Sequence, residues 1–289
     1  MKLPCLVLAG ILLLFAPSTA KCDSPDGGFG LYILKAVKAL GEQRAGKGYG
    51  PGTFTQDLTF GDDGILKATH PPMTMCVAAQ LEVFVEALDI YTRETKDFSP
   101  FHFVPKTTWE RLRPLDLRGQ IWIVQHSPST GAAHAFENFG MGKRIPFKDL
   151  FPGTFLNFNR TNKSGHGVIF LGFIDKSGSD LPTFSDQVAG FRYFSAQGAH
   201  KPDGGLGYRW AFFSDAKCPT LSADKKRDCG VIRSEKNNLL VGGYVKAPKT
   251  WDQDRAAGQI LSGQEASDPT LTREGRFNGK YFTGVTTDD

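Results

Sequence analysis

The spacing of apolar residues divides the chain into a helical first half and a strand-rich second half. Apolar side chains recur every three or four positions from 30 to 43 and again from Cys76 onward, which predicts two amphipathic helices. Residues 54–65 alternate loosely around a Gly-Asp-Asp-Gly turn and predict a short strand pair. Shorter helices are expected at 107–113 and at 130–138.

Strand patterns dominate from residue 155 on. Alternating or continuous apolar runs predict five strands, at 155–158, 167–174, 190–197, 208–213 and 239–245. A further apolar run at 119–125 fits either a strand or a buried helix. Because the helices come first and the strands follow as an antiparallel meander, the sequence predicts an α+β fold with helices packed against an antiparallel sheet.

Cys76 is the first residue of the second long helix, and this position can make its thiol reactive. The double proline Pro71-Pro72 and Thr74, the expected N-cap, mark the helix start. A helix N-terminus carries partial positive charge and unpaired N–H groups, so it favours a thiolate over a thiol. Cys76 is therefore the candidate nucleophile. The two sides of its helix differ in polarity, with Val77, Leu81, Phe84, Val85 and Leu88 on one and Glu82, Glu86 and Asp89 largely on the other.

A histidine at the start of a strand supplies the matching base. His166 lies between Gly165 and Gly167, directly before an apolar run. Small neighbours leave room for another group to approach the imidazole, which can pair with a thiolate and later protonate a leaving group. We therefore predict a Cys76–His166 dyad, with His126 as the runner-up base.

A base imidazole needs a third group that fixes its tautomer and orientation. If 166–174 and 190–198 pair as an antiparallel hairpin, residue 166 falls opposite about residue 198. Gln197 is then the nearest polar side chain on the neighbouring strand, and Ser195 lies one pleat further along the same face. Because an amide oxygen can accept the imidazole N–H, Gln197 is the preferred orienting residue and Ser195 the alternative.

Composition and charge argue against several function classes. The formal net charge is only +4, and the chain has no arginine-rich helix or aromatic–basic stripe of the kind that binds nucleic acid. It also lacks a phosphate-binding loop, a dinucleotide motif and a serine nucleophile elbow. His126 and His134 have no Cys or acidic residue at zinc-site offsets, so neither a metal nor a cofactor is expected.

The N-terminus predicts export. Lys2, the apolar stretch 6–15 and the small residues Ser18-Thr19-Ala20 form a signal peptide, with cleavage expected after Ala20. The apolar stretch is too short to span a bilayer comfortably, and no later run is apolar enough to do so. We therefore expect a secreted or periplasmic protein without an integral membrane segment.

Export permits disulfide bonds. Cys218 and Cys229 flank a short polar stretch, and they are expected to form a disulfide across a hairpin loop. A bridge between Cys22 and Cys76 is an alternative that would remove the nucleophile.

Three stretches of the chain resemble the NlpC/P60 superfamily of papain-like cysteine peptidases and amidases. They are Cys76 at the head of its helix, 147–158 with its Pro-Gly entry into a strand, and the histidine strand 165–172. The resemblance implies a papain-like fold, cleavage of an amide bond in peptidoglycan peptides, and a third polar residue on the next strand, matching Gln197 or Ser195. Met-Cys-Val-Ala stands where the family usually has Asp-Cys-Ser-Gly, which indicates a divergent member.

These observations divide the chain into four parts: a signal peptide at 1–20, a helical and loop lead-in at 21–69, a catalytic domain at 70–246 and a polar C-terminal tail at 247–289. The expected function is that of an exported cysteine hydrolase acting on peptidoglycan. Two alternatives stay open. One is a non-catalytic cell-wall binding or scaffolding protein on the same fold, and the other is an enzyme that transfers the acyl group to an amine.

Overall fold

The protein is described by a computed structural model that covers residues 25–50, 52–103, 131–162, 164–198, 201–235, 239–258 and 287–288. The predicted signal peptide, the segments 107–113 and 119–125, and His126 lie outside the described residues.

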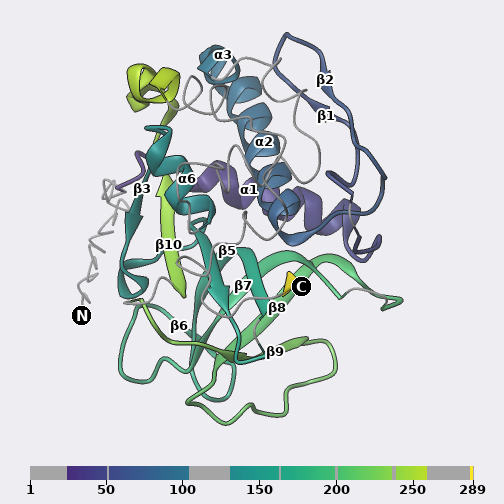
Figure 1. The fold of residues 1–289 in the computed structure, drawn as a ribbon, viewed down its shortest axis with the longest axis vertical. Helices are drawn as coiled ribbons and strands as arrows, with labels where there is room; N and C mark the ends of the chain where they lie inside the picture. Colours follow the sequence, from purple (N-terminus) through teal and green to yellow (C-terminus); the bar gives the residue numbers. More distant parts are fainter. Residues whose placement is uncertain are drawn as a thin grey trace, which may run out of the picture.

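The fold is α+β, with the long helices together over one face of a curved sheet (Figure 1). The helical segments are α1 (Gly30–Arg44), α2 (Cys76–Thr95), α3 (Ser99–Phe103) and α6 (Ala132–Asn138), with 3-10 turns η2 (Phe147–Asp149) and η3 (Pro248–Thr250). A separate antiparallel pair consists of β1 (Leu58–Thr59) and β2 (Ile65–Leu66). None of the helices in the described ranges combines the length and the apolarity needed to cross a membrane.

The main sheet runs in the order β3-β10-β4-β5-β7-β8-β9. Its strands are β3 (Gly142–Ile145), β4 (Phe155–Asn159), β5 (Ser164–Ile174), β7 (Gly190–Gln197), β8 (Gly205–Phe213), β9 (Arg227–Val231) and β10 (Leu240–Val245), and β5 also pairs with β6 (Asp180–Leu181) and β11 (Thr287–Asp288). All five predicted strands form, as β4, β5, β7, β8 and β10. The pattern does not reveal β3, β6 and β9, because they are short or polar.

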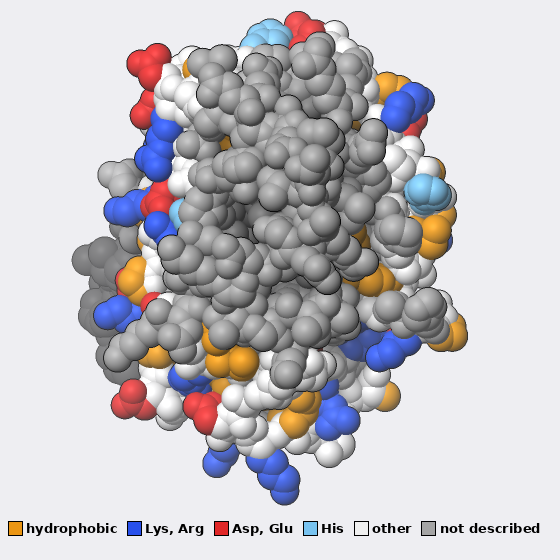
Figure 2. Space-filling model, in the orientation of Figure 1, with side chains coloured by type: hydrophobic (Ala, Val, Ile, Leu, Met, Phe, Trp, Pro, Cys, Tyr) orange, Lys and Arg blue, Asp and Glu red, His pale blue; other side chains and the backbone are white. Residues whose placement is uncertain are grey.

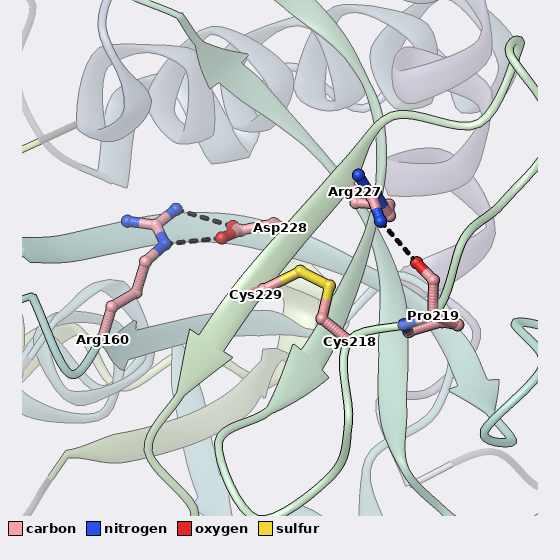
Figure 3. Close-up of a disulfide and its surroundings, with 6 residues drawn as sticks. All are labelled: Arg160, Cys218, Pro219, Arg227, Asp228 and Cys229. Carbon is pink, nitrogen blue, oxygen red and sulfur yellow. Dashed lines mark hydrogen bonds and ion pairs between the residues drawn. A yellow bond between two sulfur atoms is a disulfide. The ribbon is translucent and has the colours of Figure 1, made fainter.

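The sheet is mixed, so the expected antiparallel meander is wrong: β11 pairs with β5 in parallel, and β10 lies between β3 and β4 and not beside β8. β9 pairs with β8 in parallel, because the chain between them crosses back before β9 begins. The Cys218–Cys229 disulfide is present as predicted, but it closes this crossover and not a hairpin loop (Figure 3).

The far edge of the sheet curls round to meet β4. Arg160 bridges Val231 at the end of β9, and backbone hydrogen bonds join Ile232 N to Asn159 O at 2.8 Å and Thr161 N to Gly230 O at 2.9 Å. The strands from β4 to β9 therefore form a barrel that is closed at this end. The side chains of each strand point alternately into the barrel and outward.

This alternation creates two apolar layers. The inner core fills the barrel with aromatic side chains, among them Phe158, Phe170, Phe191 and Tyr193. The outer core lies between the sheet and the helices, where α1 and α2 pack on outward-facing residues such as Ile169. The predicted lead-in 21–69 contributes α1 and β1 to this same outer core. On the face in Figure 2, side chains of both charges lie around the margin, in keeping with the small net charge of +4.

A buried ion pair holds the closed end of the barrel. Arg160 Nε and Nη2 donate to the two carboxylate oxygens of Asp228, both at 2.6 Å, and the side chains are only 3% and 4% exposed (Figure 3). Tyr193 Oη donates to the same carboxylate at 2.7 Å, and Arg160 Nη1 donates to Ser164 Oγ at 2.9 Å. A fully hydrogen-bonded fork of this kind offsets the desolvation of both charges.

Loss of one partner of this pair should destabilise the fold strongly. Asp228→Ala leaves the Arg160 charge buried, so we expect a loss of about 3–5 kcal/mol in the free energy of unfolding, measured by urea titration. The double variant Arg160→Met/Asp228→Leu should recover part of that loss. As a control, Glu94→Ala removes an exposed pair with Lys35 and should cost less than about 1 kcal/mol. Equal losses for Asp228→Ala and Glu94→Ala would contradict the assignment.

Candidate active site

Cys76 is the first residue of α2, as predicted, but its helix is not capped as expected. The N-cap position belongs to Met75, whose backbone is extended and which makes no side-chain cap. Thr74 instead donates from Oγ1 to Thr53 O at 3.0 Å, and its own carbonyl accepts from Gly50 N at 3.2 Å. The start of the helix is therefore fixed by the loop that precedes it, and Thr74 is a tether and not a cap.

The thiol of Cys76 is almost completely buried, at 1% exposure, and it is not part of the Cys218–Cys229 disulfide. The alternative bridge would need Cys22, which lies outside the described residues. Cys76 stands at the positive end of a helix of 20 residues, so local electrostatics there favour an anion.

Gln80, one helical turn after Cys76, joins α2 to the sheet. Its Nε2 donates to Val168 O at 3.0 Å, while its Oε1, on a side chain 1% exposed, accepts no hydrogen bond from the described residues. A Cβ at Gly167 would lie 2.4 Å from that oxygen. The absence of a side chain at Gly167 therefore lets α2 approach β5, and does not make room beside the imidazole of His166 as we expected.

His166 points into the barrel. In the β4–β5 pairing it lies opposite Phe158, and its ring is 5.5 Å from the Phe158 ring and 5.6 Å from the Tyr193 ring, measured between centroids. Both aromatic residues belong to the inner core, and His166 is 3% exposed. Since Gly167 faces α2, its neighbour His166 must face the opposite side of the sheet.

The structure therefore does not assemble the predicted dyad. The helix that carries Cys76 packs on the outer face of the sheet, and the imidazole of His166 lies on the inner face. The physical reason is that successive side chains of a strand point to opposite faces of the sheet. A sequence motif does not show which face a given residue takes.

Gln197 lies on the same side of the sheet as His166. β5 and β7 pair antiparallel as predicted, and extending the ladder beyond the Ile169–Phe194 pair places Gln197 opposite His166. The expected partner position, 198, is off by one because a bulge between Phe170 and Gly172 inserts an extra residue into β5. The hairpin was therefore predicted correctly, and its register changes at the bulge.

The two candidate orienting residues have other contacts. Ser195 Oγ donates to Gly167 O at 2.6 Å, so its hydroxyl hydrogen is used by the backbone. Gln197 contacts the hydroxyl of Tyr193, which also donates to Asp228. Burial first, and then the nearby Asp228 carboxylate, raise the pKa of Tyr193 well above its ordinary value, so this phenol stays a neutral donor.

Two amide side chains on or beside α2 were not predicted from the sequence. Gln80 is one, and Asn157 on β4 is the other: its Oδ1 accepts from the backbone N of Ala132 at 3.0 Å and so caps α6. Neither carries a motif, because an amide on a helix or a strand usually faces water. Their positions depend on Gly131 and Gly167, where a Cβ would collide with them.

Other titratable side chains in the described residues offer no second candidate site. Asp62, Asp63 and His102 could offer ligand atoms within 4.8 Å of one another, but all three are exposed on the surface. Burial lowers the pKa of His134 on α6 to about 4, with the positive charge of Arg144 adding to the effect, so this imidazole is neutral at pH 7.

Comparisons of this chain with protein-family models, with curated proteins and with solved structures found no match. The resemblance to the NlpC/P60 superfamily therefore depends on the three sequence stretches alone.

Glu82 on α2 is buried, although its helical position suggested the polar side. The segment around Thr55 covers it, and Thr55 donates to its carboxylate from both the backbone N, at 2.9 Å, and the hydroxyl. Desolvation nevertheless raises the pKa of Glu82 to about 7. Because the folded pKa lies above the unfolded one, protonation favours the fold, and stability falls as pH rises from about 4.5 to about 7.

The variant Glu82→Gln should remove this pH dependence. The amide keeps one acceptor for Thr55 N and gains a donor for the Thr55 hydroxyl, so we expect unchanged packing and a flatter melting temperature between pH 5 and 8. The difference from the parent protein should reach roughly 3 kcal/mol in favour of the variant at pH 8. Glu42→Gln, at an exposed position on α1, serves as the control and should leave the pH profile unchanged. Parallel profiles for parent and Glu82→Gln would refute the role of Glu82.

Proposed function

We propose that this protein is an exported thiol hydrolase that cleaves an amide bond, with Cys76 as the nucleophile and peptidoglycan peptides as substrates, on a papain-like arrangement of helix and sheet. The observation that carries the proposal is the position of Cys76 as the first residue of α2, the helix that Gly167 allows to pack closely on the sheet. A thiol at this position has the electrostatic environment that nucleophilic cysteines need.

The reaction follows from that position. The thiolate attacks the amide carbonyl carbon and forms a C–S bond, and the N–H groups of the first helical turn are suited to hold the oxyanion. The C–N bond then breaks, and the amine leaves with the proton that the thiol gave up. Water hydrolyses the thioester, which releases the acid and restores the thiol.

His166 can act as the base only if the start of β5 rearranges, because its imidazole lies on the inner face of the sheet. Catalytic contacts are often loose without substrate and tighten in the reacting complex. The role of His166, and of Gln197 behind it, is therefore a separate part of the proposal with its own variants. In this proposal the hydroxyl of Ser195 keeps its hydrogen bond to the backbone carbonyl of Gly167.

A non-catalytic wall-binding protein is the second candidate. It is favoured by the burial of Cys76 and His166, at 1% and 3% exposure, on two different faces of one sheet. In that case the thiol and the imidazole are packing residues. Transfer of the acyl group to an amine would use the same thioester, and no described contact favours it over hydrolysis.

Digestion of purified muropeptides by the mature protein, followed by mass spectrometry, tests the proposal. The parent protein should produce amide-cleaved fragments, and Cys76→Ser should lower the rate by more than about a thousandfold, as for other covalent nucleophiles. The matched control Cys218→Ser/Cys229→Ser removes two cysteines distant from α2 and should keep the activity of the molecules that remain folded. Cleavage by Cys76→Ser would show that the nucleophile is elsewhere.

The variant His166→Gln separates the two candidate roles of the imidazole. If it acts only as a barrel residue, the variant loses thermal stability but keeps its turnover per folded molecule. If it is the base, turnover falls as far as in Cys76→Ser, and the double variant is hardly slower than either single one. The absence of cleavage by the parent protein, together with alkylation of Cys76 by iodoacetamide only after unfolding, would favour the binding protein.

A further inference from the structure

A groove of about 840 Å³ opens between α1 and the outer face of the sheet. Leu34 and Val37 of α1 form one wall, and β5, β7 and β8 form the floor. The groove exists because α1 packs at the start of β8, near Leu206, and leaves Tyr208 and Trp210 partly uncovered. Its other lining residues include Leu171, Arg192, Tyr208, Trp210, Asp203 and Lys226.

The floor of the groove is aromatic. Tyr208 and Trp210 are two residues apart on β8, so their side chains point to the same face. Tyr208 is 39% exposed and packs on Phe194 of β7 with 5.3 Å between ring centroids. Trp210 is half-buried and pairs across the strands with Arg192. Exposed aromatic rings side by side on a rigid strand provide a flat stacking surface.

Polar groups of both charges surround these rings. Arg192 donates from Nη1 to Asp180 at 3.0 Å, while its buried Nε has no acceptor among the described residues. Lys226 pairs with Asp203 at the rim, and Lys225 lies over the Trp210 ring with 5.5 Å from Nζ to the centroid. The groove therefore offers donors and acceptors together and is not a single-sign charged surface.

This combination favours one ligand class over two others. A peptide cannot add to the floor as a strand, because β5, β7 and β8 are each paired on both sides. A nucleic acid would meet the carboxylates of Asp203 and Asp224 in the groove. Sugar rings have apolar faces that stack on aromatic side chains, and hydroxyl groups that bond to both acidic and basic side chains.

We infer that this groove binds a glycan chain, with sugar rings stacked on Trp210 and Tyr208 and hydroxyls held by Arg192 and the Asp203–Lys226 pair. The inference goes beyond hydrolysis and does not depend on Cys76. The groove is nevertheless connected to the start of α2. The backbone N–H groups of Gly46 and Gly48 donate to the carbonyls of Leu206 and Gly204. Tyr49 then forms an isolated β-bridge with Thr74, just before α2. A glycan in the groove would therefore lie on the same outer face of the sheet as α2.

Binding is tested in the Cys76→Ser background of the mature protein, so that failure of hydrolysis and failure of binding are distinguished. Chitohexaose is the probe, and calorimetry measures its Kd. Trp210→Ala should weaken binding at least about tenfold, the usual effect of losing an aromatic anchor. Phe98→Ala, which removes another aromatic residue, 40% exposed and outside the groove, is the matched control and should leave the Kd unchanged.

Arg192→Met provides a second variant, because it keeps the length of the side chain and does not remove an aromatic ring. It should weaken binding several-fold, with an unchanged near-ultraviolet circular dichroism spectrum. Three results would overturn the inference: no binding of chitohexaose by the parent, equal Kd values for Trp210→Ala and Phe98→Ala, or tighter binding of poly-L-glutamate or single-stranded DNA than of chitohexaose.

Discussion

The bidentate contact between Arg160 and Asp228 is the constraint on which the barrel depends. It joins the chain just after β4 to β9, two strands that are far apart in the order of the sheet, and it does so where both side chains are shielded from water. At such a position a charge is tolerated only when its partner is present. The contact therefore brings Tyr193, Ser164 and the start of β5 into one arrangement, and with them the position of His166.

The Cys218–Cys229 disulfide acts on the other side of the same strand. Asp228 is buried in the barrel, whereas its neighbour Cys229 is exposed, as the alternation of a strand requires (Figure 3). The disulfide closes the crossover that brings β9 in parallel beside β8. One covalent bond and one buried ion pair thus hold β9 from its two faces, which compensates for its low intrinsic strand propensity.

Gly167 lies between the two layers that hold the candidate functional residues, the outer core under the helices and the inner core of the barrel. On its outer side, α2 approaches until Gln80 bonds the carbonyls of the sheet. On the inner side, its neighbour His166 lies among the aromatic rings of the barrel. The outer layer holds both Cys76 and the groove along α1, so the chemistry we propose and the ligand we infer belong to one face.

The sequence by itself determined most of the local structure. Helical periodicity located α1 and α2, alternating or continuous apolar runs located five strands, and two cysteines that flank a polar stretch predicted their disulfide. Each of these signals is local, because burial of one face imposes a period on neighbouring residues. The antiparallel pairing of β5 with β7 could also be predicted, because the two strands are separated in the sequence only by the insertion 175–189.

Only the tertiary structure decided what these elements bring together. The parallel pairing of β9, the burial of Glu82 under Thr55 and the contact of Arg160 with Asp228 all join residues distant in sequence, and no periodicity encodes them. The same holds for the predicted dyad. The pattern placed Cys76 at a helix start and His166 at a strand start, but the face to which His166 points depends on which side of the sheet α2 covers. The helix α2 packs on the face that Gly167 presents, because the absence of a side chain at Gly167 lets the helix approach the sheet.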